Sequence, residues 1–90
     1  MDISFVVITN GGKPEELGWV LKSIQHQNIK NYEIFVSGYL GDKDPFPSVN
    51  YEFVDAKEAA DTGNLAEMRN KACKKAKYDL ILLLDVFDNQ

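Results

Sequence analysis

The sequence has only one cysteine, Cys73, among its 90 residues. An internal disulfide needs two cysteines and a cysteine-based zinc site needs several, so both are excluded. Long apolar stretches are also missing. The longest strongly apolar run covers residues 80–84, whereas a membrane-spanning helix needs about 20 apolar residues. No basic segment opens the chain, as a secretory signal would require. We therefore expect a cytoplasmic protein without a membrane span.

Positive charge is scarce as well. Lys and Arg number 10 and Asp and Glu number 14, which gives a formal net charge of −4 at pH 7. An acidic chain has no electrostatic reason to coat nucleic acid or an anionic membrane, so neither is an expected partner. Hydrophobic residues make up 44% and charged residues 27% of the chain. This composition is typical of a globular protein, and the length allows one domain, residues 1–90.

Four segments have the composition of β-strands. The first and the last are apolar almost throughout, which is typical of strands buried on both faces of a parallel sheet. The third alternates between apolar and polar residues, which predicts a more exposed strand at a sheet edge. The four segments are residues 3–8, 32–37, 49–54 and 80–84.

A first helix is predicted after the first strand. Pro14 suits the first turn of a helix because its missing N–H is not needed there. Apolar residues then recur at helical spacing and form one buried stripe. Trp19 is interpreted as a packing residue of the same helix. The stripe consists of Leu17, Val20, Leu21 and Ile24.

A second helix is predicted before the last strand. Asn64 can cap it, with Glu67 as the reciprocal partner of a capping box. Its buried stripe is expected to run from Leu65 to Ala76. Residues 55–63 are polar and are expected to be irregular.

The resulting order of elements is β-α-β-β-α-β, which predicts a three-layer α/β/α sandwich. The segment between the first two strands is long enough for a right-handed helical crossover, so these strands should be parallel. Ligands of such sheets bind beyond the carboxyl ends of the strands. In this chain those ends carry residues 9–12, 37–39 and 85–88.

Five segments resemble motifs of the family 2 glycosyltransferases, in the same order and at the same spacing. Together they cover essentially the whole chain, which is similar to the N-terminal, nucleotide-binding half of that family. They are residues 5–17 (FVVITNGGKPEEL), 21–27 (LKSIQHQ), 31–36 (NYEIFV), 63–70 (GNLAEMRN) and 78–85 (YDLILLLD). The resemblance implies a Rossmann-like half of the glycosyltransferase A fold, with a mostly parallel sheet of order 3-2-1-4.

The resemblance also implies a function, namely glycosyl transfer from a nucleotide-sugar donor, with a UDP-sugar as the expected donor. Mg²⁺ or Mn²⁺, held by carboxylates, would neutralise the negative charge of the diphosphate. The residues implied in metal binding are Asp85 and Asp88. Those implied in donor binding are Thr9, Asn10, Gly11, Arg69 and Asn70, and Tyr39 could stack on the uracil ring.

Two departures from the family pattern keep other interpretations open. The family has an acidic residue after the second strand, where this chain has residues 37–39 (SGY), and its metal motif D-x-D reads Asp85, Val86, Phe87 here. If the protein lacks an acceptor-binding half, water could take the place of the acceptor and hydrolyse the donor. The chain could also be a degenerate binding module without catalysis, or an unrelated small α/β domain. Arg69 could simply pair with a surface acid.

The apolar strand at residues 80–84 adds a further expectation. If it lies at the edge of the sheet, its unpaired backbone invites another strand. We therefore expect a homodimer formed through this fourth strand.

Overall fold

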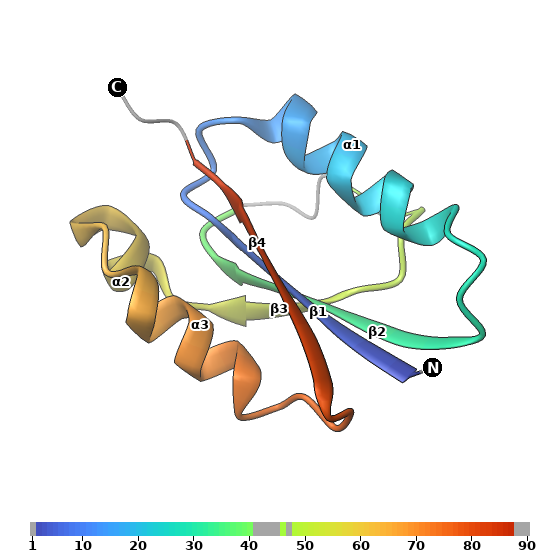
Figure 1. Cartoon of the computed structure of the whole chain (residues 1–90). Helices are drawn as coiled ribbons and strands as arrows, with labels where there is room; N and C mark the ends of the chain where they lie inside the picture. The colour runs from blue at the N-terminus through green and yellow to red at the C-terminus, as the bar shows by residue number, and fades with distance from the viewer. Residues whose placement is uncertain (1, 41–45, 47, 88–90) are drawn as a thin grey trace.

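The computed structural model describes residues 2–40, 46 and 48–87. These residues form four strands and three helices, and Figure 1 shows how they are arranged. The strands are β1 (Asp2–Thr9), β2 (Asn31–Gly38), β3 (Glu52–Asp55) and β4 (Leu80–Val86). The helices are α1 (Pro14–Gln25), α2 (Lys57–Thr62) and α3 (Leu65–Cys73).

The strands form one sheet in the order β3-β2-β1-β4. All three strand pairs are parallel, so the predicted α/β class and strand order are confirmed. β1 lies in the middle, with Ile3 beside Tyr32 of β2 on one side and beside Leu80 of β4 on the other. β3 and β4 are the two outer strands.

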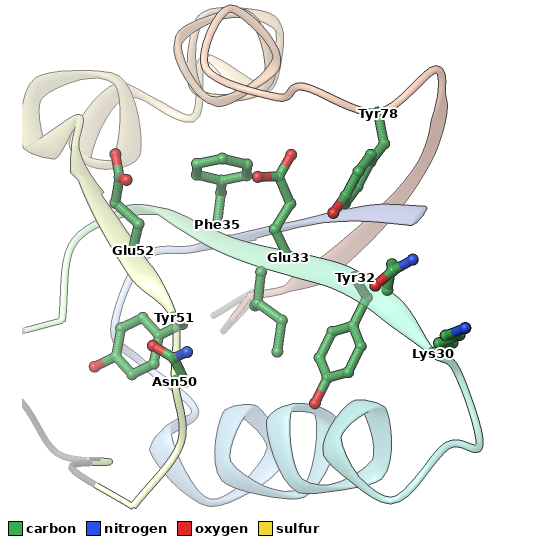
Figure 2. Close-up of a pocket in the computed structure, with 10 residues that line it drawn as sticks. Lys30, Tyr32, Glu33, Phe35, Asn50, Tyr51, Glu52 and Tyr78 are labelled. Atoms are coloured by element: carbon green, nitrogen blue, oxygen red, sulfur yellow. The ribbon is translucent and has the colours of Figure 1, made fainter. Parts of the chain in front are cut away.

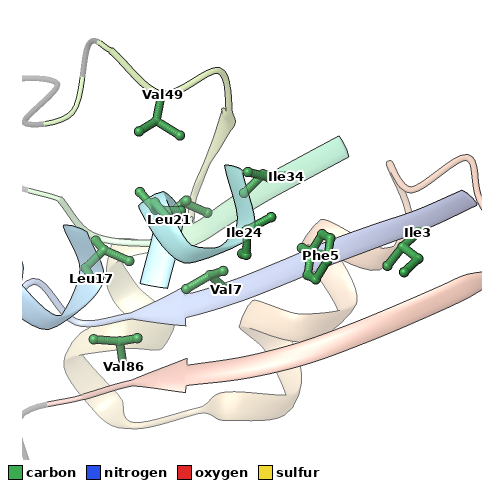
Figure 3. Close-up of a cluster of buried hydrophobic side chains, with 10 residues drawn as sticks. Ile3, Phe5, Val7, Leu17, Leu21, Ile24, Ile34, Val49 and Val86 are labelled. Carbon is green, nitrogen blue, oxygen red and sulfur yellow. The ribbon is translucent and has the colours of Figure 1, made fainter. Parts of the chain in front are cut away.

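The two faces of the sheet carry separate hydrophobic clusters because side chains alternate along each strand. Phe5 and Val7 of β1 pack with α1 on one face (Figure 3), whereas Val6 and Ile8 pack with α2 and α3 on the other. Figure 1 accordingly shows α1 on one side of the sheet and both other helices on the opposite side. The predicted stripe of α1 is confirmed in its buried members, Leu17, Leu21 and Ile24.

A polar node fastens the segment between α3 and β4 to the sheet. The Ser4 hydroxyl donates to Glu33 Oε2 at 2.6 Å. The same carboxylate oxygen accepts the Lys77 N–H at 2.8 Å, and Ser4 Oγ accepts the Tyr78 N–H at 3.3 Å. Three chain segments that are distant in sequence therefore meet at one carboxylate.

The prediction that residues 55–63 are irregular was wrong, because α2 occupies Lys57–Thr62. This helix has no amphipathic pattern of large side chains and buries only Ala59 and Ala60. It begins where the Asp55 carboxylate accepts the Lys57 N–H at 3.2 Å. It ends at Gly63, whose φ of 71° suits a residue without a side chain.

The second predicted helix is shorter than expected and ends at Cys73. The N–H groups of Lys75 and Ala76 bond to carbonyls three residues back, so the chain continues as a tighter turn after the helix. The following N–H group, of Lys77, donates to Glu33. The Asn64 cap is confirmed, since its side chain accepts the Glu67 N–H at 3.1 Å.

The capping box around Asn64 is not reciprocal. The Asn64 N–H donates to the Ala59 carbonyl at 2.8 Å and is not bonded to the Glu67 side chain. α2, which the sequence analysis did not predict, thus supplies the acceptor. The third strand also begins later than predicted, at Glu52, although its place at a sheet edge is confirmed.

Trp19 was wrongly expected to be a packing residue, since it is 70% exposed on α1. It lies outside the buried stripe, beside the half-buried Val20. No helix within residues 2–40, 46 and 48–87 combines the length and apolarity that a membrane span needs.

Candidate functional site

The carboxyl ends of the three long strands meet at one end of the sheet. Thr9 of β1 lies beside Gly38 of β2 and beside Val86 of β4. The predicted loops after β1 and β2 and the end of β4 are therefore brought together. From β1 the chain passes through α1 to β2 on one side of β1, whereas β4 lies on the opposite side of β1. The strand order therefore reverses between β1 and β4. Such a switch point is the usual ligand position in parallel sheets.

The loop after β1 is held by its own side chains. Thr9 is fully buried, and its hydroxyl oxygen accepts the Gly11 N–H at 3.1 Å. The Asn10 side-chain oxygen accepts the Gly12 N–H at 3.0 Å. Thr9 therefore shapes the loop from inside, and the half-buried Asn10 and Gly11 are the parts of this loop closest to solvent among the predicted donor-binding residues.

The end of β2 leaves no room for the acidic residue of the family pattern. Ser37 is fully buried, and its hydroxyl donates to the Met68 carbonyl at 2.9 Å. Gly38 has a φ of 128°, and a Cβ atom there would overlap the Thr9 carbonyl oxygen. Close packing of β2 against β1 and α3 therefore leaves no space for a larger side chain at either position.

Tyr39 lies next to the loop after β1. Its N–H donates to the Thr9 carbonyl at 3.2 Å, and a Cβ atom on Gly11 would approach the Tyr39 carbonyl oxygen to 3.0 Å. The Lys57 ammonium lies 5.4 Å from the centre of the Tyr39 ring. The ring is therefore at the predicted edge, with a cation from α2 over one of its faces.

Arg69 and Asp85 form the charged centre of this end of the sheet. Arg69 of α3 donates from Nη2 to Asp85 Oδ2 of β4 at 2.8 Å. Both side chains remain partly exposed, at 34% and 45%. Arg69 Nε is buried and has no hydrogen-bond partner among the described residues. Asn70 is exposed on α3, and no hydrogen bond in the described part of the chain joins its side chain to this pair.

A cavity of about 570 Å³ opens beside the pair. Its walls come from the start of α1, the junction of α2 with α3, and the end of β4. Lys13 and Glu16, which are 3.5 Å apart, line it together with Asp85. The sequence analysis did not place Glu16 in the site; its position in the helical turn that follows the β1 loop was the available signal. The cavity is lined by Lys13, Glu16, Gly63, Leu65, Asp85 and Phe87.

The described side chains at this site are too few to hold a cation alone, so a bound molecule would have to supply most of the ligands. Asp88 lies outside the described residues, and among the residues described no three His, Cys, Asp or Glu side chains gather as a metal site. One oxygen of Asp85 is already bonded to Arg69. Mg²⁺ is commonly held by one or two carboxylates and completed by phosphate oxygens. Asp85 and Glu16 both line the cavity, and each already has a cationic partner, Arg69 and Lys13 respectively.

A second cavity, of about 660 Å³, lies at the amino-terminal half of β2, away from these residues (Figure 2). Tyr32 and Tyr51 line it on the α1 side, and Glu33 and Tyr78 on the α3 side. The cavity exists because β3 pairs only with Phe35–Gly38 of β2. The Glu33 carboxylate there already accepts two hydrogen bonds that fix the fold.

Comparison with protein-family models, curated proteins and solved structures gave no match to this chain. Only the residues of this chain and their geometry therefore bear on its function. The strongest arrangement is the Arg69–Asp85 pair beside a cavity at the switch point of the sheet.

Proposed function

We propose that the chain binds a nucleoside diphosphate sugar, a UDP-sugar in the simplest case, beyond the carboxyl ends of β1 and β4. The proposal treats the fold as a three-layer α/β/α half of the glycosyltransferase A type. The observation that carries it is an arginine and a carboxylate, 2.8 Å apart, beside an open cavity at the switch point. The sequence resemblance supports the same position.

Each group in the site has a part in this proposal. The Arg69 guanidinium would bond to diphosphate oxygens, since its fixed donors match phosphate geometry. The loop at residues 9–12 and Tyr39 would hold the nucleoside, mainly through backbone groups. Asp85 would hold Mg²⁺ or Mn²⁺, with Glu16 in the wall of the same cavity. The cation would supply positive charge that stabilises the departing diphosphate.

The proposed reaction is transfer of the sugar to an acceptor hydroxyl or to water. The acceptor oxygen forms a bond to the anomeric carbon while the bond from that carbon to the diphosphate oxygen breaks. The diphosphate leaves with the bonding electron pair, and the acceptor proton passes to solvent. Arg69 assists by stabilising the negative charge that develops on the leaving group.

One observation favours a second candidate, a degenerate module that has no catalysis and binds a partner instead of a nucleotide-sugar. Ser37 and Gly38 leave no space for an acidic side chain at the end of β2, so recognition of the nucleoside lacks that group. In this candidate the Arg69–Asp85 ion pair is a permanent link between α3 and β4.

Calorimetric titration of UDP-glucose distinguishes the candidates. We expect binding with Mn²⁺ and at least tenfold weaker binding with chelator or in Asp85→Asn. The matched control is Asp79→Asn, which removes the same charge from an exposed acid just before β4. Mn²⁺ alone should give little heat. Equal binding by Asp85→Asn and the unmodified chain, or no binding by folded protein, would contradict the proposal.

A further inference from the structure

The outer edge of β4 is unpaired in the described part of the chain. β4 is the last strand of the sheet and pairs only with β1. Its side chains are apolar on both faces of the sheet, as in an inner strand. Leu80, Leu82 and Leu83 are nevertheless 41%, 44% and 48% exposed. A strand with the composition of the sheet interior thus lies at the boundary with solvent.

An apolar groove follows this edge on the α1 face. It has a volume of about 600 Å³, and no charged side chain lines it. Trp19 of α1 stands over it with 70% of its surface exposed. Leu82 and Leu84 form the floor at the sheet edge. Exposed apolar surface of this kind marks a place where another protein surface binds.

We propose that the occupant is a second copy of this chain, bound by antiparallel pairing of β4 with β4 of its partner. The two sheets then become one continuous sheet around a two-fold axis perpendicular to it. This inference does not depend on the nucleotide site.

The sequence of β4 favours pairing with itself. If Leu82 lies opposite the partner's Leu82, then Leu80 meets the partner's Leu84 and Ile81 meets the partner's Leu83. All five residues of the apolar run then contact apolar residues, and each stays on its own face of the sheet. The α1 faces of both copies lie on the same side, so the two Trp19 grooves join and cover each other.

One feature of this register opposes pairing. Asp79 comes opposite the partner's Asp85, and like charges placed opposite each other destabilise a strand pair. Arg69, 2.8 Å from Asp85 in the same copy, offsets much of this repulsion. The charges lie at the two ends of the paired segment, where solvent screens them.

The size of the surface fits a reversible dimer. β4 has seven residues, which span about 23 Å at a rise of about 3.3 Å per residue. The sheet and the α1 layer together are about 20 Å deep, since each layer takes roughly 10 Å. The contact is then about 450 Å² per copy and about 900 Å² in total, which is below the roughly 1,200 Å² of a stable interface and in the range of weak, transient ones. We therefore expect dissociation in the micromolar range.

Sedimentation measurements over a range of concentrations test the proposal, and Trp19 provides a second signal. Because it is the single tryptophan of the chain, its emission should shift to the blue over the same range in which the mass doubles. Leu82→Lys and Leu83→Lys should each leave a folded monomer. The control is Phe53→Lys, on the opposite outer strand, where Phe53 is 40% exposed; it should still dimerise.

Several outcomes would overturn the proposal. A monomer at millimolar concentration would do so, as would assemblies larger than a dimer. Equal loss of the dimer in folded Phe53→Lys and Leu82→Lys would mean that β4 is not the interface. A mass that doubles without any change in Trp19 emission would also exclude this arrangement.

Cross-linking tests the register. In a Cys73→Ala background, Leu82→Cys should form a disulfide between copies under oxidised glutathione, since the two positions lie opposite each other. Leu80→Cys should not, because it faces Leu84 of the partner. Cross-linking of Leu80→Cys alone would refute the proposed register.

Discussion

Replacing Gly38 with alanine should destabilise the protein far more than the same change at Gly63. Both glycines have positive φ, 128° and 71°. A Cβ atom at Gly38 would overlap the Thr9 carbonyl oxygen and come within 3.2 Å of Met68 Sδ, whereas nothing lies within 4 Å of one at Gly63. Backbone strain of about 1–2 kcal/mol therefore applies at both sites, and overpacking adds about 2–3 kcal/mol, the upper part of its usual range, only at Gly38.

The expected cost of Gly38→Ala is thus about 3–5 kcal/mol, against about 1–2 kcal/mol for Gly63→Ala. For 90 residues the total free energy of unfolding is about 5–13 kcal/mol. Urea unfolding followed by circular dichroism measures both. With a slope of about 1 kcal/mol per M, the midpoints of the two variants should differ by roughly 2–3 M. Equal midpoints would refute the reasoning, and would mean that the end of β2 can move away from β1.

Three further substitutions test side-chain hydrogen bonds by the same unfolding measurement. Asn64→Ala removes the cap of α3 and should cost about 1 kcal/mol, whereas an unchanged midpoint would mean that the Ala59 carbonyl alone fixes this helix end. Ser37→Ala should cost about 1–3 kcal/mol, because the Met68 carbonyl loses its buried donor; Ser37→Thr is no control, since the site has no spare volume. Glu33→Ala should cost about 2–3 kcal/mol by removing the acceptor of two hydrogen bonds, and a loss below about 1 kcal/mol would contradict the role of the node.

The sheet could be predicted because its strands are marked by local composition. The run at residues 3–8 is apolar except for Ser4 and the run at residues 80–84 is apolar throughout, which is typical of strands in a parallel sheet. α2 could not be predicted in the same way. Its only buried side chains are two alanines, which give no helical periodicity of large apolar residues. Its boundaries depend on Asp55 and Gly63, which are also common in irregular loops.

The site was predictable in position but not in detail. Parallel strands place their carboxyl ends together, so residues 9–12, 37–39 and 85 could be expected at one edge. The Arg69–Asp85 bond depends on how far α3 lies from β4, which no sequence pattern encodes. The burial of Thr9 and Ser37 likewise follows from packing between strands and helix α3.

The exposure of Trp19 was missed for a related reason. Position 19 is next to the buried stripe of α1, and an aromatic residue there usually packs inward. It remains exposed because β4 is the last described strand on that side, with no further strand to extend the sheet beneath it.

The central position of β1 has a consequence for the time course of folding. β1 is completed on one side by β2, its nearest strand in the chain, but on the other by β4, where Ile3 lies beside Leu80. Such contacts between distant segments require closure of a long loop and slow the search for the native state. During synthesis, the edge of β1 that pairs with β4 therefore stays open until the segment carrying β4 has left the ribosome. During that interval an apolar strand edge is open to pairing with other chains.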